Sequence, residues 1–138
     1  MTETTDFNSK IIAEFRATGG KVGGPFAGSD ILLLHHTGAH TGTERVSPLA
    51  YQRVGESFAV FASKAGAPAN PAWYHNLLAH PDTTMEVGTE TLRVRARVAE
   101  PAERDVLWER QIQRAPHFAE YERKAAPRVI PVVVLDRC

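Results

Sequence analysis

The chain has a single cysteine, Cys138, and it is the last residue. One cysteine forms no internal disulfide, which favours a reducing compartment such as the cytoplasm. An excess of one charge is also lacking, because sixteen basic side chains balance sixteen acidic ones. Without a net field we expect no nucleic-acid partner, so any anion-binding site must be local.

Long hydrophobic runs are missing as well. The longest near-continuous apolar run, VIPVVVL, is far shorter than the ~20 residues that cross a bilayer. The N-terminal stretch MTETTDFNSK lacks the basic-then-apolar pattern of a signal peptide. We therefore expect a soluble cytoplasmic protein without a transmembrane segment. Its 138 residues, 43% of them hydrophobic, suit a single domain with its own core.

The chain also lacks the sequence signatures of nucleophilic catalysis and of nucleotide binding. It contains no GxSxG elbow, no cysteine near a histidine, no P-loop and no dinucleotide fingerprint. An enzyme without a nucleophile can take its chemistry from a cofactor.

Short strands joined by hairpin-length links are what the chain does contain. Hydrophobic periodicity predicts strands over residues 30–36, 45–54, 57–63, 83–87, 91–100 and 129–135, and helices over 6–19, 71–79, 102–115 and 118–124. This order favours a small antiparallel or mixed barrel over a parallel α/β sheet. Residues 1–29 supply an N-terminal helix and a connection to the rest of the single domain, 1–138.

Capping residues predict where two of the helices begin and end. Asp6 is expected to cap the first helix and Gly19 to end it. We expect its apolar face to pack on the domain, and contact with a membrane surface is the alternative. For the second helix, Asn70 is expected as the N-cap and Pro71 as the first helical residue. Pro48 predicts an edge or a bulge in its strand.

Three of the six histidines, His35, His36 and His40, fall within six positions. Neighbouring residues on a strand point to opposite faces, so His35 and His36 do not readily share one ion. His40 has no cysteine, aspartate or glutamate at a known ligand spacing. We therefore expect no metal.

The stretch TGAHTGTER, residues 37–45, has the composition of an anion-binding loop. Gly38 and Gly42 permit a positive-φ backbone that turns consecutive N–H groups toward one oxyanion. Arg45 adds a planar two-pronged donor, and His40 adds partial charge. An ordinary Gly/Thr-rich hairpin loop is the alternative.

A second stretch, SKAGAPANPAWYHN, strengthens the anion hypothesis. Ser63 and Lys64 end a predicted strand, and a helix N-terminus, which favours anions, follows within seven residues. The alternatives are a solvated Lys64 and a Trp73 that belongs to the core. Two such loops at the ends of neighbouring strands indicate a phosphorylated ligand lying across the sheet.

Three segments in order, LLLHHTGAHTGTERVSPLAY, FAVFASKAGAPANPAWYHNLLAHPD and VIPVVVL, resemble the deazaflavin-dependent nitroreductase family. The resemblance extends from about Ile31 to Leu135, and it is most specific in TGxxTG with the following arginine and in SKAGxxxNPxWYxN. It implies an α+β, mainly β fold: a split β-barrel, like that of flavin reductases and pyridoxamine oxidases, with flanking helices. It also implies an oxidoreductase that transfers a hydride from reduced coenzyme F-420, an 8-hydroxy-5-deazaflavin, to a flat conjugated acceptor such as a quinone, nitro compound or activated alkene.

The resemblance further implies which residues bind cofactor and acceptor. The residues so implied for the cofactor are Gly38, His40, Thr41, Gly42, Arg45, Pro48, Leu49, Ser63, Lys64, Ala65, Gly66, Trp73 and Asn76. The acceptor pocket would be lined by Ala50, Ala115, Phe118 and Tyr121, and only Tyr121 keeps the tyrosine that family members carry at these positions. Tyr121 is the predicted proton donor to the acceptor, with Ser63 second.

Other functions remain open from the sequence. An FMN-dependent oxidase or reductase on the same fold would use the same phosphate cradle, and a non-catalytic deazaflavin carrier would use the same binding residues. The basic face Arg93, Arg95 and Arg97 is expected to be solvated or to contact the acidic tail of the family's cofactor. Dimerisation is common among split barrels, so a homodimer stays open.

Overall fold

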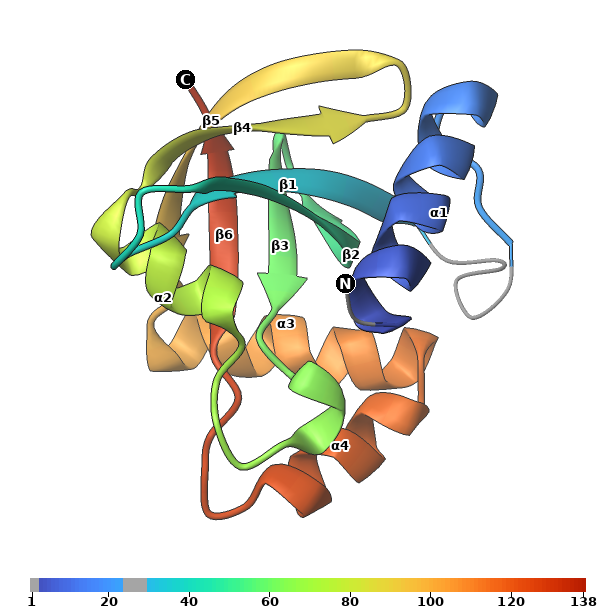
Figure 1. Ribbon diagram of the computed structural model, residues 1–138. Coiled ribbons are helices and arrows are strands. Elements are labelled where there is room, and N and C mark those ends of the chain that lie inside the picture. The colour runs from blue at the N-terminus through green and yellow to red at the C-terminus, as the bar shows by residue number, and fades with distance from the viewer. Residues whose placement is uncertain (1–2, 24–29) are drawn as a thin grey trace.

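The computed structural model describes residues 3–23 and 30–138 and contains a six-stranded barrel (Figure 1). The strands are β1 (Ile31–Thr37), β2 (Glu44–Val54), β3 (Ser57–Phe61), β4 (Asp82–Val87), β5 (Glu90–Val98) and β6 (Val132–Arg137). They pair antiparallel in the order β1-β2-β3-β6-β5-β4, and β4 returns to β1, which closes the barrel. The predicted mainly β, split-barrel fold is confirmed.

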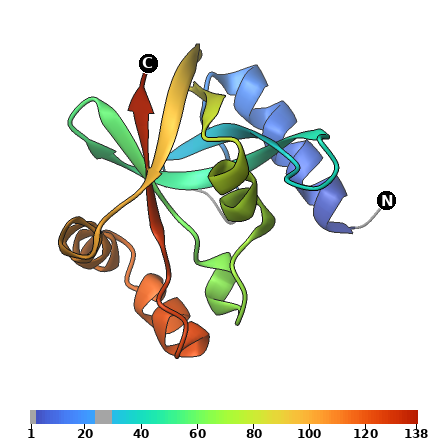
Figure 2. The ribbon, with the colours of Figure 1, turned by 90° about the vertical axis from the view of Figure 1, so that its left-hand side faces the viewer.

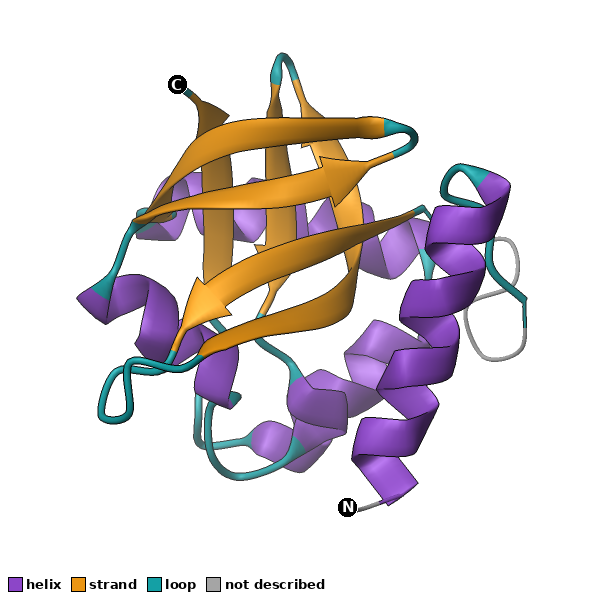
Figure 3. Ribbon diagram, turned by 45° about the horizontal axis from the view of Figure 1, so that its top comes forward, coloured by secondary structure: helices purple, strands orange, loops and turns teal. Residues whose placement is uncertain are grey.

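Helices surround this barrel (Figure 3). They are α1 (Glu3–Thr18), α2 (Ala72–Ala79), α3 (Pro101–Arg114) and α4 (His117–Ala125), with a short 3₁₀ turn η2 (Lys64–Gly66) after β3. Figure 2 shows η2 beside α4, although the two are far apart in sequence, and their residues are in contact. Among the described residues, no helix has the length and apolar character needed to cross a membrane.

The core lies partly inside the barrel and partly between the barrel and its helices. Leu32 and Leu34 point inward, where they join Trp73 and Leu77 of α2. Outside the barrel, α1 packs Phe15 against β1, with its side chain only 1% exposed. The apolar face of α1 therefore packs on the domain, as predicted. A third cluster fills the space between α3, α4 and the outer face of β3 and β6.

Two helix starts differ from the prediction. The first helix begins at Glu3, so Asp6 lies within it instead of capping it. In α2, Pro71 is the N-cap and Asn70 precedes the helix. The Asn70 side chain does not cap α2, because its Oδ1 accepts a hydrogen bond from Arg128 Nη1 at 2.6 Å.

Pro48 occupies a stretch of β2 that has one neighbouring strand. It lies opposite Leu33 of β1, whereas the pairing of β2 with β3 begins only at Tyr51. Its missing N–H therefore removes no ladder bond on the β3 side, in agreement with the predicted edge position.

Candidate functional site

The TGAHTG loop, residues 37–42, joins β1 to β2 and is held by its own hydrogen bonds. The N–H of Gly38 donates to the carbonyl of Thr43 at 2.9 Å, and the N–H of Gly42 donates to the carbonyl of Gly38 at 2.9 Å. The N–H of Thr43 donates to Thr41 Oγ1 at 3.2 Å. These bonds make the loop a closed turn that keeps its shape from within.

The two glycines of this loop have different reasons to be glycine. Gly42 has φ +70°, the left-handed conformation that was predicted. Gly38 is not in that region, so the prediction for its backbone was wrong. A Cβ at Gly38 would instead collide with Thr41 Oγ1. A larger residue at position 38 would displace the Thr41 hydroxyl, whereas Gly42 is favoured by its left-handed backbone.

A buried polar chain ties the loop to α2. The N–H of Ala39 donates to Asn76 Oδ1 at 2.9 Å, and Asn76 Nδ2 lies 2.9 Å from His36 Nδ1. Because a backbone N–H only donates, the amide oxygen of Asn76 must face the loop and its nitrogen must donate to His36. The His36 proton then sits on Nε2, which donates to Ser47 Oγ at 2.9 Å. The Asn76 side chain therefore links the loop to the buried His36 and helps to hold the loop in place.

Burial lowers the pKa of His36 to about 4, with smaller contributions from the charges of Arg45 and His35. His36 is consequently neutral near pH 7, which the hydrogen-bond chain requires. His35 points to the opposite side of β1, where its Nε2 lies 2.7 Å from Glu86 Oε2. The expectation that His35 and His36 face apart is confirmed. Within the described ranges no cluster of three or more His, Cys, Asp or Glu that would hold a metal is found.

The loop offers fewer N–H donors to an anion than the sequence suggested. The N–H groups of Gly38, Ala39, Gly42 and Thr43 already have partners. Among the residues that the structure describes, none accepts a hydrogen bond from the N–H of His40 or Thr41. These two groups, with the exposed side chains of His40 and Arg45, are what the loop presents to an anion.

The SKAG segment, residues 63–66, follows β3 and has an unusual backbone. Lys64, Ala65 and Gly66 have φ of +48°, +53° and +84°, so three consecutive residues are left-handed. For a residue other than glycine this costs about 1–3 kcal/mol, and such strain persists only where surrounding structure enforces it. Lys64 and Ala65 are exposed, whereas Gly66 is buried.

Helix α4 enforces part of this conformation. A Cβ on Gly66 would lie 2.8 Å from Lys124 Cβ and 3.0 Å and 3.1 Å from the carbonyl oxygen and Cα of Tyr121. Only glycine fits against this backbone. The contact also brings Tyr121, the predicted proton donor, next to the SKAG segment.

Arg128 enforces the rest, and the sequence analysis missed it. Its Nη1 donates to the carbonyl of Ala62 at 3.0 Å and to Asn70 Oδ1 at 2.6 Å. Its Nη2 donates to the carbonyls of Ser63 at 3.0 Å and Ala67 at 2.7 Å, and its Nε donates to that of Ala67 at 3.1 Å. Arg128 lies between α4 and β6, outside any motif, so nothing in the sequence singles it out.

The predicted acceptor residues are only partly brought together. Tyr121 is half-buried at the edge of an aromatic cluster, with its ring centroid 5.1 Å from that of Phe118. Phe118 is only 7% exposed, packed between Phe61 and Trp108, so it belongs to the core more than to an open pocket. Ala50 packs instead in the cluster beneath α1. Trp73 is likewise 7% exposed inside the barrel, and Pro48 is buried.

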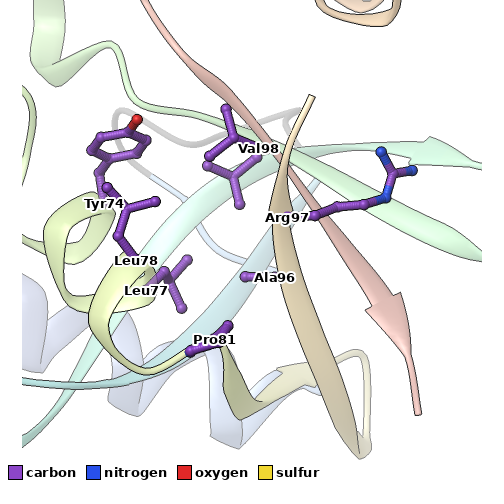
Figure 4. A pocket seen from close by; sticks show the side chains of 8 residues that line it. Tyr74, Leu77, Leu78, Pro81, Ala96, Arg97 and Val98 are labelled. Carbon is purple, nitrogen blue, oxygen red and sulfur yellow. The ribbon is translucent and has the colours of Figure 1, made fainter. Parts of the chain in front are cut away.

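Two hollows in the surface lie away from the SKAG segment. A polar hollow of about 290 Å³ lies at the base of the TGAHTG loop and is lined by His35, His36, Thr37, Glu44, Asp82, Thr83, Thr84 and Arg93. Figure 4 shows an apolar hollow between α2 and β5, where Tyr74, Leu77 and Leu78 face Ala96 and Val98. The predicted SKAG and Tyr121 residues line neither hollow.

The basic face of β5 is largely neutralised. Arg95 pairs with Asp82 at 2.9 Å, and Arg97 pairs with Glu103 at 2.7 Å and Asp136 at 2.8 Å. Of the arginine row, only Arg93 lines the polar hollow beside the TGAHTG loop. The other two arginines therefore have carboxylate partners within the protein, which weakens the suggested contact with an acidic cofactor tail.

Comparison with known proteins gives a consistent family. A family model described as F420H(2)-dependent quinone reductase matches residues 9–137. An F420H(2)-dependent quinone reductase of Mycobacterium tuberculosis is 40% identical over 129 residues, which are 91% of this chain and 86% of the relative.

Solved structures agree with this similarity. One described as an F420-H2 dependent reductase is 36% identical, with a TM-score of 0.69 over 77% of this chain and 93% of its own. Another, described as a domain-swapped dimer, is 32% identical, with a TM-score of 0.71 over 97% of this chain and all of its own. This chain therefore belongs to the F420H(2)-dependent quinone reductase family.

Proposed function

We propose that this protein transfers a hydride from reduced coenzyme F-420 to a quinone. The observation that carries the proposal is the family match, which spans both the TGAHTG loop and the SKAG segment. Strand β2 connects the two segments, because β1, which precedes the TGAHTG loop, pairs with residues 44–50 of β2, and β3, which precedes the SKAG segment, pairs with residues 51–54. The loop therefore lies beside the first residues of β2 and the SKAG segment nearer its middle, so a ligand that touches both would lie along this strand.

The residues of these two segments suit a phosphorylated cofactor. The exposed guanidinium of Arg45, the His40 side chain and the N–H groups of His40 and Thr41 would bind the phosphate end. Ser63, Lys64, Ala65 and Gly66 would border the deazaflavin, with Leu49 on the neighbouring strand. Asn76 would act through the loop that it anchors. Bound reduced deazaflavin supplies a hydride in a two-electron step.

The protein's own contribution would be orientation and a proton. The backbone of Tyr121 lies against Gly66, and the family resemblance makes its hydroxyl the group proposed to hydrogen-bond the reduced acceptor, with Ser63 as the second candidate.

The assembly is proposed by similarity. The relative described as a domain-swapped dimer supports a homodimer for this chain too. Light scattering on the purified protein gives its mass in solution and distinguishes monomer from dimer. The cytoplasmic location stays a prediction from the sequence.

A binding titration tests the proposed cofactor. Purified protein is titrated with oxidised F-420 and, separately, with FMN, while tryptophan fluorescence is followed. Micromolar or tighter binding of F-420, followed by its quinone-dependent oxidation when it is added reduced, is the expected result. Preference for FMN would show that FMN, and not F-420, is the cofactor. Tight F-420 binding without turnover against any quinone would indicate a carrier.

A further inference from the structure

We propose that Arg128 is a positioning residue that fixes the SKAG segment in its cofactor-binding conformation. The proposal rests on the proposed function, because the segment affects the reaction only if it borders the cofactor. Neither the family's motifs nor the sequence analysis includes Arg128. It is inferred from its contacts alone.

The SKAG segment needs outside support. Its own hydrogen bonds are those from the N–H of Gly66 to Ser63 and from the N–H of Ala67 to Lys64. Lys64 and Ala65 are left-handed without being glycine, and both are exposed, so little packing holds them. Released from its contacts, such a segment would relax to ordinary right-handed or extended backbone.

Arg128 supplies the support from both sides of the strained residues. Its guanidinium donates to the backbone carbonyls of Ala62 and Ser63 before them. After them it donates to the backbone carbonyl of Ala67 and to the side-chain oxygen of Asn70. A planar group with several fixed donors can bridge acceptors that far apart along a turn. A lysine has its donors on one nitrogen and cannot bridge them all.

Arg128 is also hydrogen-bonded to α4. The backbone N–H of Arg128 donates to the carbonyl of Ala125, the last residue of α4, at 3.0 Å. Gly66 packs against Tyr121 of the same helix. Arg128 and α4 thus hold the SKAG segment as one unit, and this unit sets the distance between the segment and Tyr121.

The test compares Arg128→Ala with wild type and with Arg123→Ala. Arg123 is the matched control, because it is an exposed arginine on α4 that forms an ion pair with Glu120. We expect Arg128→Ala to weaken F-420 binding at least tenfold, which is about 1.4 kcal/mol, and Arg123→Ala to leave it unchanged. Adding methylguanidinium, which fits the space vacated by the side chain, should restore part of the affinity.

Hydrogen exchange gives a readout that needs no cofactor. The amides of Gly66 and Ala67 should exchange faster in Arg128→Ala, whereas those of β1 should keep the wild-type rate. Methylguanidinium should slow the exchange again. A general loss of stability would instead accelerate amide exchange in β1 as well, and the added methylguanidinium would not slow it.

The outcomes separate the two proposals. Unchanged F-420 affinity in Arg128→Ala overturns the positioning role, and so does unchanged exchange at Gly66 and Ala67. If the wild-type protein binds no F-420, the proposed function fails, and the exchange data alone then decide whether Arg128 holds the segment. If Arg128→Ala does not fold, Arg128→Lys is put through the same measurements, with a smaller loss expected.

Discussion

The TGAHTG loop and the SKAG segment both belong to the proposed cofactor site but are stabilised differently. The loop closes on itself with backbone bonds, has an outside anchor in Asn76 of α2, and only its Gly42 is left-handed. The segment has few bonds of its own and three left-handed residues, so it depends on Arg128 and α4, roughly sixty positions along the chain. A loop held mostly by its own residues is easier to predict from its sequence than one held mostly by distant residues.

The largest effect that would test this contrast is expected from Gly66→Ala. The added Cβ would meet the backbone of Tyr121 at 3.0–3.1 Å while the residue is held at φ +84°. We expect a loss of about 3 kcal/mol in the free energy of unfolding, measured by urea denaturation. Gly42→Ala is the control, because its Cβ would meet nothing within 4 Å at φ +70°. It should cost about 1–2 kcal/mol, and equal losses at both sites would contradict the contrast.

The next largest effect is expected from Asn76→Ala. It removes the partner of the Ala39 N–H and leaves His36 Nδ1 without a donor in a buried position. Such a loss costs about 1–3 kcal/mol, and F-420 affinity should fall with it because the TGAHTG loop is released. Hydrogen exchange should accelerate at Ala39 and stay unchanged at Gly66. Acceleration at both positions would show that the two loops are not independently held.

A smaller, pH-dependent effect is expected at His36. Its pKa is about 4 in the folded protein against an ordinary value of 6.5, so the unfolded chain binds the proton more readily. Its contribution to stability is therefore complete above pH 6.5 and is lost as the pH falls toward 4. His36→Gln can accept from Asn76 and donate to Ser47 without titrating. Urea denaturation from pH 7 to 4 should show a weaker pH dependence in this variant; an unaltered profile would exclude His36 as the source.

The smallest effect on stability is expected from Tyr121→Phe, since the contacts of Gly66 are with the backbone of Tyr121. Turnover should nevertheless fall by about 10²-fold, the usual contribution of a positioned proton donor, with F-420 affinity nearly unchanged. Steady-state kinetics with a quinone and a fluorescence titration measure the two quantities. Unchanged turnover would remove Tyr121 from the mechanism and leave Ser63 to be tested.

Hydrophobic alternation predicted the strands and the barrel, because each strand has one face toward a core. The two motifs predicted the family. Burial was harder to predict: Trp73 and Phe118 stand at motif or pocket positions, yet they pack in the core, since a motif does not report which way a side chain points. Arg128 was missed because its partners lie about sixty residues away along the chain. The start of α2 differs by one residue, since Pro71 is its N-cap. The individual roles of the site residues stay predictions.

The place of β6 in the barrel has a consequence for the order of synthesis. This strand is the last of the six along the chain, yet it pairs with β3 on one side and β5 on the other. A ribosome adds residues from the N-terminus onward, at about 5–20 per second. Until residues 128–137 have been added, the growing chain has neither a closed ring of strands nor the arginine that shapes the SKAG segment. The barrel and the SKAG segment can therefore take their final form only after β6 has been synthesised.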